Sequence, residues 1–168
     1  MAIKIFIDQG HNPSGPNTGA EGNGLVEQDI TYAVGQYLAE LLRADPRFEV
    51  RLSRNAPDEI LGTSNATSLA ARVQAANDWP ADYFISIHCN ANENPAINGT
   101  EVYVYQEGTQ AYWLAQHVLR GIGNFAVRLE GPGAAYHGNL TAVFDFLQHM
   151  RQRDLIQQVD RVVVRRIG

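Results

Sequence analysis

Residues 3–15 read IKIFIDQGHNPSG, an apolar run that ends in a polar turn carrying His11. Apolar and β-branched residues in an unbroken run are typical of a buried strand, which we expect over residues 3–7. The following stretch, residues 9–24, is rich in Gly, Asn and Pro and predicts a long loop. Long loops in compact domains usually carry function, so His11 becomes a candidate site residue.

The chain beyond this loop alternates between strand-like and helix-like segments as far as residue 122. Apolar residues recur with a helical period in three segments, and short apolar runs lie between them. Thr67 or Ser68 could cap the second of the three helices. The expected helices cover residues 26–44, 67–79 and 109–122, and the expected strands cover residues 3–7, 48–54, 81–90 and 99–105. This order predicts an α/β fold, a three-layer sandwich in which helices flank a mostly parallel twisted sheet.

The last part of the chain, residues 123–168, has a different pattern. A strand is expected over residues 125–129 and a helix over residues 140–150. Residues 153–168 are amphipathic and predict a terminal helix. We see no internal repeat or linker, so we expect one domain over residues 1–168.

Composition narrows the classes of function. Hydrophobic residues make up 45% of the chain and the net charge is −5, which fits a globular domain and argues against a nucleic-acid partner. The start of the chain lacks the pattern of a secretory signal, and no apolar run approaches the roughly 20 residues of a membrane span. We therefore expect a chain that is made in the cytoplasm. One cysteine, Cys89, allows neither an internal disulfide nor a cysteine-rich metal site.

Two histidines and a glutamate could meet at one edge of the predicted sheet. His11 follows the first strand, His88 closes the strand FISIH, and Glu27 begins the first helix directly after the loop. Ligands of open parallel sheets gather at the carboxyl ends of the strands, so the three converge if the first and third strands are neighbours. Two histidines and one carboxylate form a catalytic zinc set, and also the non-haem iron set. Fold analogy favours zinc, which is expected at the carboxyl ends of the strands.

Each of these residues also has an ordinary interpretation. His11 could be an exposed loop residue, and His88 a hydrogen-bonded core residue. Glu27 stands where the helix dipole favours a carboxylate in any protein. Glu21 is a rival ligand within the loop. Cys89 is a poor candidate, because strand alternation points it away from the face that carries His88.

Five segments together resemble a known family. They are IDQGHNPSGPNTGAEGNGLVEQD from residue 7, RLSR from 51, AARVQAAN from 70, ADYFISIHCNAN from 81 and NGTEVYVY from 98. In this order and spacing they are similar to the zinc-dependent N-acetylmuramoyl-L-alanine amidases, the type 3 amidase catalytic domain of autolysins and phage endolysins. The resemblance covers about residues 3–122, and residues 123–168 diverge from it.

The resemblance implies that His11, Glu27 and His88 bind Zn²⁺. Asp8 and Asn90 flank these ligands and could orient them, although turn chemistry suits both residue types equally well.

Three more residues fall in the matching segments. Arg72 and Asn77 match the family's helix, where a structural hydrogen bond from helix to loop is the expected role. Arg54 ends the second strand, where a solvated surface position is expected.

The family also carries a glutamate near its carboxyl end, which acts as general base. The segment AVRLEG, residues 126–131, is a loose match that puts Glu130 in this place. His137 could be a substitute acid/base or a fourth metal ligand. The resemblance then implies a hydrolase that cuts the amide between N-acetylmuramic acid and L-alanine in peptidoglycan, acting on the wall after release or lysis.

Three alternatives remain open. A chain that has lost the base would be an inactive module that binds zinc and peptidoglycan. A shortened tail would expose a sheet edge and could lead to a homodimer. The loop GPNTGAEGNG, residues 15–24, could instead bind phosphate or a nucleotide, although it lacks a Gly-Lys-Ser/Thr ending.

Overall fold

The computed structural model describes residues 1–91, 100–123 and 161–166. Its strands are β1 (Ile3–Gln9), β2 (Glu21–Gly22), β3 (Leu25–Val26), β4 (Phe48–Leu52), β5 (Tyr83–His88), β6 (Glu101–Tyr103) and β7 (Arg161–Arg166). Its helices are α1 (Glu27–Arg43), α2 (Asn65–Asp78) and α3 (Gln110–Gly123). Within the described residues, no helix is both long and apolar enough to cross a membrane.

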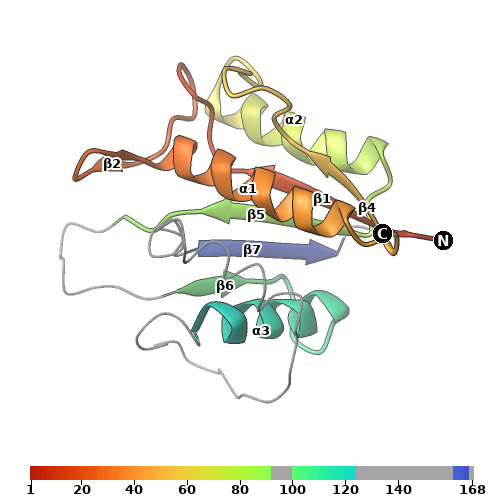
Figure 1. Ribbon diagram of the computed structural model, residues 1–168. Coiled ribbons are helices and arrows are strands. Elements are labelled where there is room, and N and C mark those ends of the chain that lie inside the picture. The colour runs from red at the N-terminus through yellow and green to blue at the C-terminus, as the bar shows by residue number, and fades with distance from the viewer. Residues whose placement is uncertain (92–99, 124–160, 167–168) are drawn as a thin grey trace.

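The main sheet has the strand order β4-β1-β5-β7-β6, and β2 and β3 form a separate antiparallel hairpin (Figure 1). β1 pairs in parallel with β4 and β5, so the first and third predicted strands are neighbours. β7 is parallel to β6 and antiparallel to β5. The sheet is therefore mostly parallel, as predicted.

Side-chain alternation along β1 builds the two layers of the core. Ile5 and Ile7 pack on one face in a cluster that includes apolar residues of α1 and α3. Phe6 points to the other face and stacks on Phe84 of β5, with ring centroids 5.8 Å apart. This second cluster holds Ala76 and the residues just after α2. Helices thus cover both faces, which confirms the three-layer α/β sandwich.

The start of α2 differs from the prediction. Ser64 is the N-cap, and neither Thr67 nor Ser68 takes that place. The Ser64 hydroxyl accepts a hydrogen bond from the backbone N–H of Thr67, and the Thr67 hydroxyl accepts one from the N–H of Ser64. This reciprocal capping box satisfies two donors at the helix terminus, while Ser68 is fully buried one position further on.

The predicted terminal helix is wrong over residues 161–166, which form β7. Three consecutive β-branched valines, residues 162–164, suit a strand. β5 and β6 also supply backbone hydrogen-bond partners on both sides of this segment. The sheet thus has a strand between β5 and β6, and the homodimer that was expected from a missing strand is not supported. The elements expected over residues 125–129 and 140–150 lie outside the described residues.

Close packing between α1 and β1 leads to a first prediction. A Cβ at Gly35 would lie 2.4 Å from Cγ of the fully buried Gln9. Replacing a helical glycine by alanine normally stabilises a protein by about 0.4–1 kcal/mol. Here we expect Gly35→Ala to lower the free energy of unfolding by about 1–3 kcal/mol, because the core must rearrange around the added methyl group.

Urea denaturation would measure this change. Gly22→Ala is the control, since a Cβ there meets no atom within 4 Å. A stabilised Gly35→Ala protein would contradict the prediction.

Candidate metal centre

Three side chains converge at the carboxyl ends of β1 and β5. Figure 1 shows that these strand ends lie beside the β2–β3 hairpin. His11 comes from the turn after β1, Glu27 is the first residue of α1, and His88 is the last residue of β5. The atoms His11 Nε2, His88 Nδ1 and Glu27 Oε1 lie 3.1 Å from one another in every pair. The Glu27 side chain is buried, whereas the two rings are 18% and 24% exposed, so the cluster is accessible from solvent.

The donor set and its spacing fit a zinc ion. Tetrahedral zinc with bonds of about 2.0–2.1 Å to nitrogen and oxygen needs ligand atoms roughly 3.3–3.4 Å apart. The observed separations of 3.1 Å are close to this requirement. The Nδ1 atom of His11 lies 3.2 Å from the carbonyl of Asn17, which it can donate to, leaving the Nε2 lone pair aimed into the cluster. Three acceptor atoms at this distance repel one another unless a cation or a proton lies among them.

Glu27 is held as a carboxylate. Its Oε1 accepts a hydrogen bond from the N–H of Cys89 at 2.9 Å, and its Oε2 accepts one from the N–H of Ala20 at 3.0 Å. Burial raises the pKa of the Glu27 carboxyl, but hydrogen bonds that both histidine rings donate in the metal-free chain, together with these two N–H groups, outweigh it. The pKa of Glu27 is therefore well below its ordinary value, and the group carries its charge at neutral pH.

A buried polar network lies behind the cluster, and Arg72 is at its centre. The Arg72 side chain is 2% exposed and forms an ion pair with Asp8. Its guanidinium donates hydrogen bonds to Asp8 Oδ1, the Gln9 carbonyl, the His11 carbonyl, Asn12 Oδ1 and Ser53 Oγ. The expected hydrogen bond from the helix to the loop is therefore present, and one of its acceptors is the backbone carbonyl of His11.

Asp8 and Asn90 differ in their burial and in their hydrogen-bond partners. Asp8 is buried, and its hydrogen bonds are to Arg72 and to the Ser86 hydroxyl rather than to the three clustered side chains. Asn90 is exposed and donates to Glu101 Oε2 at 3.2 Å.

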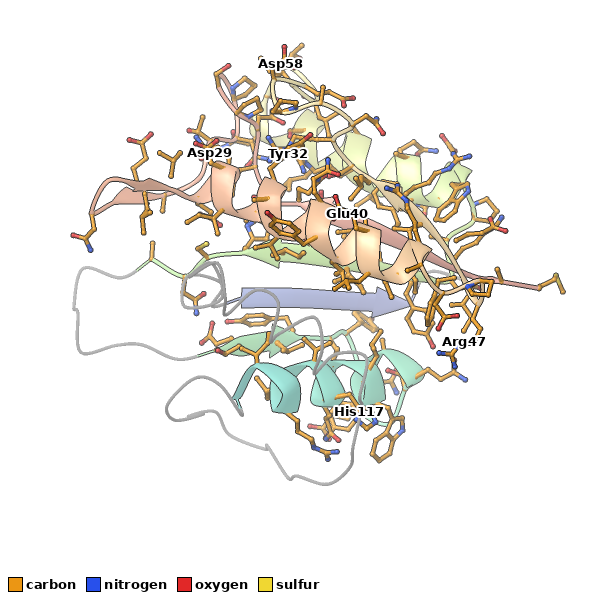
Figure 2. The ribbon with its side chains drawn as sticks, viewed as in Figure 1. Asp29, Tyr32, Glu40, Arg47, Asp58 and His117 are labelled. Atoms are coloured by element: carbon orange, nitrogen blue, oxygen red, sulfur yellow. The ribbon has the colours of Figure 1, made fainter. Side chains whose placement is uncertain are left out.

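Two sequence-based expectations are wrong. Asn77 is exposed on α2, about 140° around the helix from Arg72, and within the described residues its side chain makes no hydrogen bond to the loop. Arg54 is 1% exposed rather than solvated. Its Nη2 donates to the Gln28 carbonyl at 2.7 Å, and its guanidinium lies over the ring of Tyr32, near the start of α1 (Figure 2). Gln28 and Tyr32 belong to the first turns of α1, which therefore shield this guanidinium from water.

Of the remaining candidates, the two that the structure describes do not join the cluster. Glu21 is exposed in β2, and Cys89 contributes its backbone N–H to Glu27. Glu130 and His137 lie outside the described residues.

The glycine-rich loop is occupied by its own protein contacts. The N–H of Gly19 donates to Gln28 Oε1 and that of Ala20 donates to Glu27 Oε2, both at 3.0 Å. Glu21 pairs with Val26 in the hairpin. These N–H groups already have partners, which argues against the phosphate-binding alternative.

Asn12 is a residue that the sequence did not single out. It is fully buried and donates to the carbonyls of Pro16 and Leu61, while its own Oδ1 accepts from Arg72 and from the N–H of Leu61. Asparagine in a loop rich in Gly and Pro is ordinarily a turn residue, so no local signal indicates its burial.

Comparisons with known proteins agree with this arrangement. The family described as N-acetylmuramoyl-L-alanine amidase matches residues 5–152. This range extends past residue 122, where the sequence resemblance was expected to end, and includes the three clustered residues and Glu130. The catalytic domain of the amidase CwlV from Bacillus (Paenibacillus) polymyxa var. colistinus aligns with a TM-score of 0.61 and 25% identity, covering 97% of this chain and 79% of that one.

Two curated relatives are longer than this chain. The amidase CwlM of Bacillus licheniformis is 40% identical over 104 residues, which make up 61% of this chain and 36% of that protein. The endolysin of Bacillus phage SPP1 is 28% identical over 142 residues, or 80% of this chain and 48% of that protein. The chain therefore spans less than half the length of either relative.

The contact between β1 and β5 leads to a second prediction. A Cβ at Gly10 would lie 2.5 Å from both the Ile87 carbonyl oxygen and Cε1 of His88. Gly10→Ala must push the two strand ends apart and separate His11 from His88. We expect it to weaken Zn²⁺ binding by about tenfold or more. Competition with a chromogenic chelator measures the affinity, Gly22→Ala is the control, and an unchanged affinity would refute this account of Gly10.

The lowered pKa of Glu27 leads to a third prediction. A carboxylate whose pKa is lower in the folded chain stabilises the fold above its unfolded pKa of about 4.3, and this stabilisation is lost as the pH falls below that value. We expect Glu27→Gln to lower the free energy of unfolding of the metal-free protein at about pH 5. The difference in this free energy between wild type and variant should become smaller by about pH 3.

Urea unfolding in the presence of a chelator would measure both proteins at each pH. Glu21→Gln, at an exposed position of the same loop, controls for the loss of one surface charge. If the difference in the free energy of unfolding between wild type and Glu27→Gln became larger from pH 5 to pH 3, the predicted pH dependence would be wrong.

Proposed function

We propose, because the chain belongs to the N-acetylmuramoyl-L-alanine amidase family, that it is a zinc-dependent hydrolase of peptidoglycan. The bond it cleaves is the amide between N-acetylmuramic acid and L-alanine. The observation that carries the proposal is the convergence of His11 Nε2, His88 Nδ1 and Glu27 Oε1 within 3.1 Å of one another. The three atoms would hold the ion and leave its outer side open to water and substrate.

The reaction itself favours zinc over iron for this donor set. Cleaving an amide needs a Lewis acid and a nucleophilic water, and no electron changes hands. Zinc, when bound, supplies both functions near neutral pH and has no redox chemistry of its own.

The residues of the chain have separate tasks in this proposal. Glu27 brings a full negative charge, because its pKa is lowered and its two oxygens are held by backbone N–H groups. His11 keeps its Nε2 lone pair free for the ion through the contact of Nδ1 with the Asn17 carbonyl. The partly exposed edges of both rings leave room for the substrate's carbonyl carbon to approach.

We further propose Glu130 as the general base. It would take a proton from the attacking water and deliver it to the nitrogen of the leaving L-alanine amine. Its support is the segment AVRLEG and its position inside the family match over residues 5–152. The alternative is a module that binds zinc and peptidoglycan without cutting the amide.

Muropeptide digestion tests these proposals and is the fourth prediction. Mass spectrometry of purified peptidoglycan should show free stem peptides with an L-alanine amino terminus. Chelation should abolish their release and Zn²⁺ should restore it. We expect Glu130→Gln to slow release by about 10²–10⁴-fold while the bound zinc stays unchanged.

The outcomes separate the alternatives. Full activity in a chelator would refute the zinc dependence. A wild-type protein that binds zinc and peptidoglycan but releases no peptide would establish the inactive module.

A further inference from the structure

We propose that Arg72 is a positioning residue of the metal centre, whose guanidinium fixes the turn that aims His11 Nε2 at the ion. This inference rests on the proposed Zn²⁺ site of His11, Glu27 and His88, and it adds a residue that contacts none of the ligand atoms. Arg72 lies on α2 and reaches the turn from the face of the sheet opposite α1.

The end of β1 presents three successive backbone carbonyls to side-chain donors. The carbonyls of Gln9 and His11 accept from Nη1 and Nη2 of Arg72, each at 2.7 Å. The carbonyl of Gly10 between them accepts from the Thr31 hydroxyl at 2.7 Å. A buried carbonyl without a partner is costly, so these donors determine where the turn can lie.

The conformation of His11 makes this support necessary. Its φ is 69°, in the left-handed region that side chains other than glycine rarely adopt. Such a residue persists only where its surroundings hold it. Arg72 Nη2 binds the residues on both sides of the next peptide bond, because it donates to the His11 carbonyl and to the Asn12 side-chain oxygen Oδ1 at 2.9 Å. Rotation of the backbone at His11 would break both hydrogen bonds and turn the ring away from His88.

Arg72 is itself held in one position. Asp8 Oδ1 accepts from Nη1 at 2.6 Å, and Asp8 Oδ2 accepts from the Ser86 hydroxyl at 2.7 Å. The guanidinium is planar and offers five donors in a rigid fork, which lets one side chain reach Asp8 and the His11 carbonyl together. A lysine would keep the charge but offer only one nitrogen for these acceptors.

A purely structural role predicts a different result. If Arg72 only stabilised the fold, its loss would lower the stability of the metal-free protein but leave the zinc affinity of folded molecules unchanged. If it acts through His11, its effect on zinc affinity must disappear when the His11 ring is absent. A double-mutant cycle separates the two roles.

The experiment measures Zn²⁺ affinity by chelator competition for wild type, Arg72→Met, His11→Ala and the double variant. We expect Arg72→Met to weaken binding by about 10–100-fold in the wild-type background. In the His11→Ala background we expect less than about a twofold further loss, because the group that Arg72 positions has been removed. An equal loss in both backgrounds, or no loss in the first, would overturn the proposal.

Arg54→Met is the matched control. Arg54 is as deeply buried as Arg72, but its guanidinium reaches the Gln28 carbonyl instead of the His11 turn. Its effect on zinc affinity should be the same within about twofold with and without the His11 ring. A coupling to His11 as strong as that of Arg72 would show a general response to losing a buried arginine and would overturn the proposal.

Arg72→Lys keeps the test valid if Arg72→Met does not fold. Circular dichroism of the metal-free protein reports folding, and the visible spectrum of the Co²⁺-substituted protein reports ligand geometry in folded molecules. We expect Arg72→Lys to alter this spectrum and to weaken Zn²⁺ binding by about fivefold or more. A folded Arg72→Lys protein with the wild-type spectrum and affinity would refute the positioning role.

The same measurements distinguish this failure from failure of the proposed function. Wild-type protein that binds no Zn²⁺, or His11→Ala protein that binds it as well as wild type, would refute the metal centre itself.

Discussion

Two histidine ring nitrogens and a carboxylate oxygen, facing one another at 3.1 Å, are the constraint around which the described structure is organised. Their lone pairs repel in the absence of a cation or a proton, so the surrounding structure must hold them together. Glu27 is fixed by two backbone N–H groups, and His11 by a backbone carbonyl. The fold thus holds a preformed negative cluster that suits a divalent cation better than any neutral ligand.

The cluster joins the two layers of helices that lie on opposite faces of the sheet. Glu27 belongs to α1, whereas Arg72 reaches the same corner from α2. Two buried arginines complete the link, since Arg72 holds the His11 carbonyl and Arg54 holds the Gln28 carbonyl, next to Glu27. Each binds a backbone carbonyl at or beside a proposed ligand, so the position of the ligands depends on packing in both layers. The ion pair between Arg72 and Asp8 is buried, so the cost of removing both charges from water offsets much of its contribution to stability.

Much of the fold could be predicted from the local pattern of the chain. Apolar periodicity located β1, α1, β4, β5, β6 and α3 because each packs apolar residues in or against a core cluster. It also located α2, although that helix buries Ser68, Arg72 and Ala76 and leaves Leu69 and Val73 exposed. The prediction failed for residues 161–166, where an amphipathic pattern read as a helix forms β7. The partners of that strand are β5 and β6, which lie more than 50 positions away in the sequence, and no local pattern contains them.

By itself, the sequence determined the α/β class and the identity of His11, Glu27 and His88 as candidate ligands. Their residue types are local properties of the chain. So are their positions, with His11 after a strand, Glu27 after the glycine-rich loop and His88 at the end of a strand. The tertiary structure alone decided that β1 and β5 are neighbours, which brings His11 and His88 to 3.1 Å. It also decided that Arg54 is buried and that Asn12 and Arg72 support the turn at His11. Burial and hydrogen-bond partners depend on what other segments place around a residue, and a residue's own neighbours in the chain do not encode this.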